Sequence, residues 1–219
     1  MIEAVLFDLD GTLADTAPDL GAAANLLLAE EGLPQKSLTT LRPYTSQGVR
    51  GLLQASFGIA PGHVDYDRLA DRFLEFYAAA LCVHTGLFAG IPELLDGLES
   101  RSIAWGIVTN KRQRFTDPLV AQLGLTPRTN CVVSGDTTPE AKPSPLPILH
   151  ACALLDCLPQ NSIYVGDDLR DIQAGRAAGC RTIAVSYGYL GHSGPITTWG
   201  ADLIVDHPDE ITHFVGQSL

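Results

Sequence analysis

The chain lacks several features that would assign it to a particular class of protein. It contains no low-complexity tract and no internal repeat, so its 219 residues are not expected to form a disordered or a solenoid protein. Cations are scarce, because 14 Lys and Arg residues stand against 25 Asp and Glu residues, which gives a formal net charge of −11. A chain this acidic repels a nucleic-acid backbone, and no Lys/Arg cluster offsets the charge, so no nucleic-acid partner is expected.

Long hydrophobic runs are also missing. The longest apolar stretches are too short to span a bilayer, and the first eight residues lack the basic segment of a signal peptide. The five cysteines form no CxxC pair, which argues against zinc or redox chemistry, and we expect most of them to be small buried side chains. These absences favour a cytoplasmic protein in a reducing environment, with no membrane partner.

The apolar residues, 46% of the chain, follow two patterns. From about residue 85 onward, short β-branched runs alternate with stretches of helical spacing. This alternation is typical of right-handed βαβ units and of a parallel sheet covered on both faces. The N-terminal run predicts one more buried strand of that sheet. The predicted strands cover residues 3–9, 103–109, 131–134, 162–167, 181–185 and 202–205.

Residues 15–84 follow the second pattern. Helical spacing predicts one helix capped by Thr16, a second within residues 38–57 and a third after Asp65, with no strand between them. We therefore expect a small α-helical cap domain here, inserted after the first strand.

The rest of the chain, residues 1–14 and 85–219, is expected to form a Rossmann-like α/β core. Ligands of open α/β sheets bind at the carboxyl ends of the strands, so the insert would lie over the site as a lid. Its hinges are predicted near residues 14–16 and 84–86.

Two carboxylates follow the first predicted strand, in the segment Asp8-Leu9-Asp10-Gly11-Thr12. Side chains two positions apart project to the same side of an extended backbone. A turn at Gly11 would separate them, so that one carboxylate can attack phosphorus while the other transfers protons. The backbone amides of the turn could then face a phosphate. An ordinary Asp-Gly turn is the alternative interpretation.

Polar side chains also follow two later strands. Thr109 and Asn110 stand at the end of a predicted strand and before a predicted helix. A hydroxyl group and the backbone amides of a helix start can bind a phosphoryl oxygen there. A plain helix cap explains Thr109 equally well. Lys142 precedes a predicted helix. Its charge can neutralise a nucleophile and a transferred phosphoryl group, or it can simply be solvated.

A fourth strand end carries the carboxylates Asp167, Asp168 and Asp171. Like charges this close are costly without a cation, and oxygen ligands beside a phosphate suit Mg²⁺. Acid enrichment at a helix N-terminus explains Asp168 and Asp171 but explains Asp167 poorly. Together with the polar residues that follow the other predicted strands, this cluster predicts metal-assisted phosphoryl transfer through an aspartyl-phosphate intermediate.

These segments resemble the four motifs of the haloacid dehalogenase superfamily, in order and over nearly the whole chain. The matching residues are Asp8-Leu9-Asp10-Gly11-Thr12-Leu13, Val108-Thr109-Asn110, Lys142-Pro143, and Gly166-Asp167 with Asp171. The resemblance implies that Asp8 attacks phosphorus and that Asp10 is the general acid and base. It implies that Thr109, Asn110 and Lys142 bind the phosphoryl group.

The same resemblance implies a Mg²⁺ ion bound by Asp8, the carbonyl of Asp10 and Asp167, with Asp171 in support. Asp168 departs from the serine often found after Gly-Asp in this family. Two roles therefore stay open for Asp168, contact with the metal through water and a helix cap.

The helical insert and residues 88–95 resemble the phosphoglycolate-phosphatase-like branch of the superfamily. Other stretches are similar to bacterial phosphatases of cell-wall sugar recycling. The resemblance implies a phosphatase for a small soluble metabolite, with N-acetylmuramic acid 6-phosphate and 2-phosphoglycolate as leading substrates. A monomer and a homodimer are both compatible with the sequence. The similar stretches are residues 82–84, 105–111, 166–172 and 199–202.

Two alternative functions stay open. A phosphoglucomutase-type isomerase shares the motifs but commonly uses extra basic groups for a second phosphate, and the insert has few cations. Of these, Arg50 is the candidate for substrate contact, because the nearby Gly48 and Gly51 allow close approach. A receiver-type signalling module also accepts phosphate on an Asp. It has no helical insert and no counterpart of Asp10, whose proton transfer would hydrolyse the phosphoryl enzyme.

Overall fold

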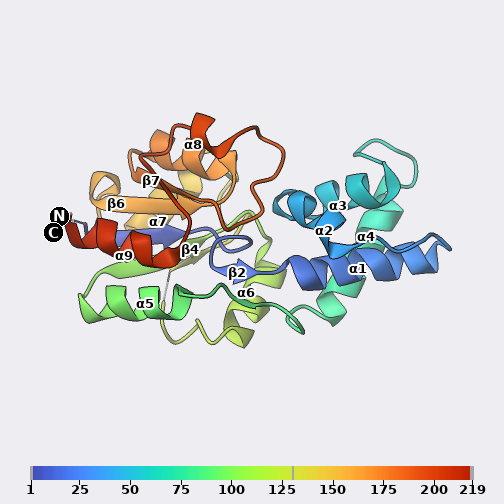
Figure 1. Ribbon diagram of the computed structural model, residues 1–219, viewed down its shortest axis with the longest axis horizontal. Coiled ribbons are helices and arrows are strands. Elements are labelled where there is room, and N and C mark those ends of the chain that lie inside the picture. The colour runs from blue at the N-terminus through green and yellow to red at the C-terminus, as the bar shows by residue number, and fades with distance from the viewer. Residues whose placement is uncertain (1, 130, 218–219) are drawn as a thin grey trace.

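A sheet of six parallel strands forms the centre of the molecule, and a group of helices lies beyond one end of it (Figure 1). The computed structural model describes residues 2–129 and 131–217. The strand order is β5-β4-β1-β6-β7-β8. All six strands lie within the ranges predicted from the sequence. They are β1 (Ala4–Phe7), β4 (Ala104–Val108), β5 (Val132–Val133), β6 (Ser162–Gly166), β7 (Arg181–Val185) and β8 (Leu203–Val205).

Helices cover both faces of this sheet because its central strands are apolar on both sides. On one face, Val5 and Phe7 of β1 share an apolar cluster with α5 (Ile91–Ser100), α6 (Gln113–Gln122) and α9 (Pro208–Gln217). On the other face, Leu6 packs with α7 (Leu146–Leu154) and α8 (Leu169–Ala178). The expected α/β fold with a parallel sheet is confirmed.

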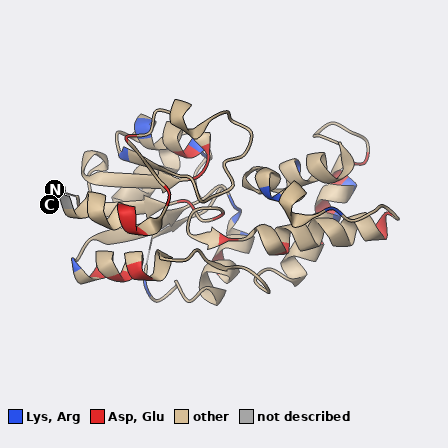
Figure 2. Cartoon of the chain, in the orientation of Figure 1, with Lys and Arg blue, Asp and Glu red and all other residues tan. Residues whose placement is uncertain are grey.

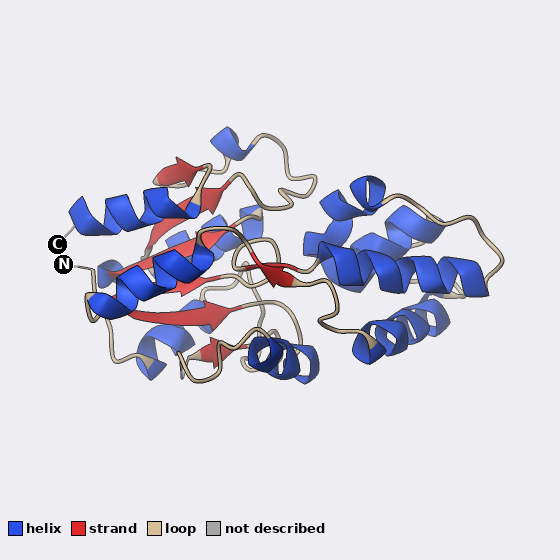
Figure 3. Ribbon diagram, turned by 60° about the horizontal axis from the view of Figure 1, so that its bottom comes forward, coloured by secondary structure: helices blue, strands red, loops and turns tan. Residues whose placement is uncertain are grey.

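The helices of residues 17–79 gather beyond the ends of the strands, separate from those that cover the sheet (Figure 3). They are α1 (Ala17–Glu30), α2 (Leu38–Leu41), α3 (Gly48–Phe57) and α4 (Tyr66–Ala79). The helix expected within residues 38–57 is present as α3, and a 3₁₀ segment, Arg42–Gln47, separates it from the short helix α2. Pro43 lacks the N–H that an α-helix would need there, and Gly48 ends the segment with a positive φ of 58°.

Two short strands join the helical group to the core. β2 (Ala14–Asp15) and β3 (Gly86–Leu87) pair antiparallel, at the segments where hinges were predicted. The sequence did not predict this pairing. Thr16 precedes α1, but its side chain does not cap the helix as expected. The Tyr189 hydroxyl instead accepts hydrogen bonds from the backbone N–H groups of Thr16 and Ala17, at 2.7 and 2.9 Å.

Apolar packing is continuous between the two parts. Phe73 and Tyr77 of α4 belong to the same buried cluster as β1, and the Tyr77 and Phe115 ring centroids lie 5.6 Å apart. Within the described residues, no helix combines the length and apolar character needed to cross a bilayer.

Candidate active site

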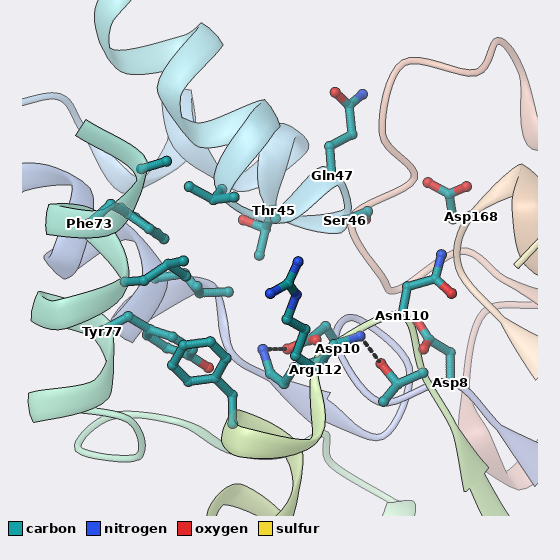
Figure 4. Close-up of a pocket in the computed structure, with 18 of the residues that line it drawn as sticks. Asp8, Asp10, Thr45, Ser46, Gln47, Phe73, Tyr77, Asn110, Arg112 and Asp168 are labelled. Atoms are coloured by element: carbon teal, nitrogen blue, oxygen red, sulfur yellow. Dashed lines mark hydrogen bonds and ion pairs between the residues drawn. The ribbon is translucent and has the colours of Figure 1, made fainter. Parts of the chain in front are cut away.

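A cavity of about 520 Å³ lies between the helical group and the carboxyl ends of the central strands (Figure 4). Its volume is typical of small-molecule sites. The core contributes the residues that follow β1, β4 and β6, and the helical group contributes the 3₁₀ segment and one face of α4. Residues on the core side include Asp8, Asp10, Thr109, Asn110, Lys111, Arg112, Lys142, Asp168, Arg170 and Asp171.

Lys142 occupies the centre of a buried network at the base of the cavity. Its Nζ lies 2.8 Å from Asp8 Oδ1, 2.7 Å from Asp171 Oδ1 and 2.7 Å from the Tyr164 hydroxyl. Burial alone would lower the pKa of Lys142, but the charges of Asp171 and Asp8 raise this pKa well above its ordinary value. Lys142 is therefore a fixed positive charge beside Asp8, and the solvated-lysine interpretation is wrong.

Asp8 keeps one carboxylate oxygen available. Lys142 binds its Oδ1, whereas Oδ2 accepts no hydrogen bond from any residue in the described part of the chain. Asp8 is 9% exposed, and it lines the cavity. One carboxylate oxygen of Asp8 is therefore fixed by Lys142, and the other is unbonded.

Asp8, Asp167 and Asp171 form an acidic cluster in which one carboxylate oxygen of each residue lies within 4.8 Å of the other two. Burial raises the pKa of Asp167 well above its usual range, and the nearby Asp8 and Asp171 raise it further. Its two oxygens accept hydrogen bonds from Thr12 Oγ1 at 3.0 Å and Tyr189 N at 2.8 Å. Such a buried excess of negative charge is the kind of donor set that binds a hard divalent cation.

Asp10 points to a different set of partners from those of Asp8. Its Oδ1 accepts a hydrogen bond from Thr16 Oγ1 at 2.5 Å and lies 2.9 Å from Lys111 Nζ. The turn between the two acids depends on Gly11, which has a φ of 89°. A Cβ atom on Gly11 would lie 2.3 Å from Asp167 Oδ2, so only glycine fits there.

Lys111 is a residue of the site to which the sequence analysis gave no role. Its side chain is 8% exposed, pairs with Asp10 and lies with Nζ 4.9 Å from the Tyr77 ring centroid. Desolvation would lower the pKa of Lys111, but the Asp10 charge raises this pKa overall. Only its position next to Asn110, in the second motif, could have indicated this role.

Thr109 and Asn110 lie at the end of β4, beside the cavity. The Thr109 hydroxyl accepts a hydrogen bond from Lys111 N at 3.2 Å. The Asn110 amide exchanges two hydrogen bonds of 2.9 Å with the backbone of Lys142. The side chain of Asn110 therefore holds the Lys142 loop against β4, and its two polar atoms are already bonded.

Asp168 and Asp171 together form a capping box at the start of α8. Asp168 Oδ1 accepts from Arg170 N at 2.9 Å, and Asp171 Oδ2 accepts from Asp168 N at 3.0 Å. Asp168 also forms an ion pair with the Arg170 side chain, whose Nη2 donates to Ser46 O of the helical group at 2.7 Å. Of the two roles open for Asp168, the structure shows the helix cap.

Arg50 is not brought to the cavity. It is exposed on α3, and it is not among the described residues that line the cavity, although its neighbour Val49 is. A Cβ atom on Gly51 would lie 2.4 Å from Tyr44 O, so this glycine serves helix packing and not substrate approach. The other four cations of the insert are bonded to acids or backbone within the described residues and also lie outside the cavity lining. They are Lys36, Arg42, Arg68 and Arg72. Figure 2 shows that basic and acidic residues are interspersed in the helical group.

Comparisons with known proteins agree with this geometry. Residues 5–185 match the family model of haloacid dehalogenase-like hydrolases. An N-acetylmuramic acid 6-phosphate phosphatase of Pseudomonas putida is 43% identical over 218 residues, covering 100% of this chain and 98% of that protein. A phosphoglycolate phosphatase of Xanthomonas campestris is 42% identical over 212 residues, covering 95% and 94%. A crystal structure from Haemophilus somnus, described as a predicted phosphoglycolate phosphatase, matches with a TM-score of 0.86 at 27% identity, covering 98% of each chain.

Proposed function

The chain belongs to the haloacid dehalogenase-like hydrolases and is a phosphoric monoester hydrolase, and we propose that it acts through an aspartyl-phosphate intermediate with Mg²⁺ as cofactor. The family resemblance found in the sequence is confirmed by the family model. The observation that carries the proposed mechanism is Asp8, with one oxygen fixed by Lys142 and the other unbonded at the cavity. Curated relatives with phosphatase names support a small phosphorylated metabolite as substrate.

The residues present fit a Mg²⁺ ion. Asp8 and Asp167 would hold it with the backbone carbonyl of Asp10, as hard oxygen ligands suited to this ion. Asp171 would support the site without binding the ion, because the Lys142 cation already pairs with its Oδ1 and the Asp168 N–H donates to its Oδ2. Asp167 instead accepts hydrogen bonds from neutral donors alone among the described residues, so its negative charge is left for the ion. When bound, Mg²⁺ would neutralise charge on the phosphoryl group and its partners.

In the first step, Asp8 Oδ2 attacks phosphorus and the bond from phosphorus to the ester oxygen breaks. Asp10 gives a proton to the departing alcohol, and Lys142 and Thr109 bind the phosphoryl oxygens. In the second step, a water attacks phosphorus while Asp10 takes its proton, which releases phosphate and restores the Asp8 carboxylate. Lys111 and Thr16 orient the Asp10 carboxylate for both transfers.

The helical group would serve as the cap domain of this enzyme, with residues 15–84 as its extent and a core of residues 1–14 and 85–219. Its 3₁₀ segment and α4 form the wall of the cavity opposite Asp8. Closing this wall over a substrate would exclude water from the phosphoryl group. The leading substrates are N-acetylmuramic acid 6-phosphate and 2-phosphoglycolate, and the free thiols of all five cysteines agree with a reducing cytoplasm.

The proposal is tested by phosphate release from both leading substrates with Mg²⁺, comparing the parent protein with Asp8→Asn. We expect turnover by the parent and a loss of at least about 10⁴-fold in the variant, because an amide is not a nucleophile toward phosphorus. The parent should also carry phosphate on Asp8 after rapid acid quenching, detected as a mass increase of the peptide that contains Asp8. Equal activity of the two proteins would contradict the proposed mechanism.

A further inference from the structure

Arg112 is a cavity-lining cation that is not paired within the described part of the chain. Lys111, Lys142 and Arg170 line the same cavity, and each is bonded to a carboxylate. The guanidinium of Arg114 lies 4.6 Å from the adjacent phenylalanine ring centroid. Arg112, by contrast, makes no side-chain hydrogen bond or ion pair with any described residue, so its charge is available to a ligand.

Arg112 lines the cavity and is also exposed to solvent. Arg112 is the extended residue immediately before α6, with φ of −67° and ψ of 146°. In Figure 4 its side chain rises from the core side toward Thr45 of the helical group, between Asp10 and the wall that carries Phe73 and Tyr77. Asp71 of α4 also lines the cavity but forms no ion pair with Arg112 among the described residues.

The wall beside Arg112 offers a large apolar surface and an unbonded polar atom. Tyr66, Phe73, Leu74 and Tyr77 line the cavity from α4. The Thr45 side-chain oxygen is buried, and no described residue bonds to it. Buried polar groups normally have a partner, so a ligand hydroxyl or amide is expected beside Thr45.

We infer that Arg112 binds a carboxylate carried by the substrate, and that the α4 wall covers a sugar ring next to it. The planar guanidinium can form two parallel hydrogen bonds to a carboxylate, which gives both affinity and orientation. This inference rests on the proposed function and specifies its substrate class as a phosphorylated sugar acid. N-acetylmuramic acid 6-phosphate has both features, whereas 2-phosphoglycolate has the carboxylate and no ring.

The test compares N-acetylmuramic acid 6-phosphate with N-acetylglucosamine 6-phosphate, which lacks the lactyl ether and its carboxylate. Arg112→Ala is expected to lower kcat/KM for the acidic sugar by about 10- to 100-fold, mainly through KM. The same variant should change kcat/KM for the neutral sugar by no more than about threefold. Arg112→Lys should restore part of the loss, because it keeps the charge but not the planar geometry.

Arg114→Ala is the matched control, since it removes a neighbouring arginine of the same cavity. We expect it to affect the two sugars equally. An equal effect of Arg112→Ala on both sugars would overturn the inference and leave the proposed function standing. Hydrolysis of 2-phosphoglycolate with no release from either sugar would also overturn it. Failure of the parent protein on every phosphate ester, p-nitrophenyl phosphate included, would instead contradict the proposed function.

Discussion

The three carboxylates at the base of the cavity differ in what each can still bind. Asp171 is bonded through both oxygens, to Lys142 and to the backbone of Asp168. Asp8 has one unbonded oxygen, and Asp167 is the buried acid whose pKa is raised well above its usual range by burial. This difference agrees with the proposed roles of Asp8 as the nucleophile and Asp171 as a supporting group.

The raised pKa of Asp167 predicts how Mg²⁺ binding depends on pH. Without the ion, the folded protein binds a proton on Asp167 that the unfolded chain releases, so stability falls as the pH rises toward the folded pKa. Bound Mg²⁺ holds the carboxylate in its charged form and removes this loss. We therefore expect Mg²⁺ at a hundredfold excess over Kd to stabilise the protein by about 2–3 kcal/mol at about pH 8. The same Mg²⁺ concentration should stabilise it less at about pH 5, where a proton competes for Asp167.

Thermal unfolding with and without Mg²⁺ at the two pH values measures this difference. The Asp167→Asn variant is the control, because its neutral amide removes both the titration and the charge that binds the ion. We expect the variant without metal to be at least as stable as the parent at about pH 8. Equal stabilisation of parent and variant by Mg²⁺ would place the ion at another site.

At the scale of elements, α1 depends on side chains from distant parts of the chain. Tyr189 accepts hydrogen bonds from the first backbone N–H groups of α1, a role that helix caps usually fill with a local side chain. Asp19, in the first turn of α1, accepts hydrogen bonds from the backbone N–H groups of Val83, His84 and Thr85. Asp19 therefore ties the start of the helical group to the segment that returns to the core.

Asp19→Ala is expected to destabilise the protein by about 3 kcal/mol, because three backbone donors lose their charged acceptor. Asp19 is 2% exposed, so water does not replace it readily. Asp67→Ala is the matched control, as Asp67 also lies in the first turn of a helix but is exposed. Urea unfolding of the two variants measures the change in the free energy of unfolding. A similar small change in both variants would show that Asp19 does not hold the start of α1 to residues 83–85.

At the scale of the whole molecule, side chains of the core hold the 3₁₀ segment of the helical group against α8 and the loop beyond β7. The Arg170 side chain donates to Ser46 O, and the Tyr44 and His192 ring centroids lie 4.4 Å apart. Both contacts involve the 3₁₀ segment, which also lines the cavity. They are suited to hold this wall against the core while leaving it able to move.

Arg170→Met is expected to loosen this contact. Loss of a charged hydrogen bond should increase amide hydrogen exchange in residues 42–47 by about tenfold and lower kcat/KM by a similar factor. Arg176→Met is the matched control on the same helix, since Arg176 bonds to Gly200 O within the core. Unchanged exchange in residues 42–47 of the Arg170 variant would show that other contacts hold the wall in place.

The sequence by itself determined the parallel sheet and the strand ends that carry the acids. These features follow from local patterns, namely the alternation of apolar runs and the polar residues directly after them. Such patterns involve residues close together in the sequence, so they can be recognised without the structure. The irregular 3₁₀ segment was not predictable in this way, nor was the pairing of β2 with β3, because both depend on contacts with distant segments.

Only the tertiary structure decided the assignments within the site. Lys111 and Arg112 are adjacent in sequence, yet one is paired with Asp10 and the other is unpaired among the described residues. Arg50, singled out for its glycine neighbours, is not among the described residues that line the cavity, and Gly51 packs against Tyr44. The partners of a charged side chain are set by where the chain folds back in space, and a sequence pattern gives no distance between residues far apart along the chain.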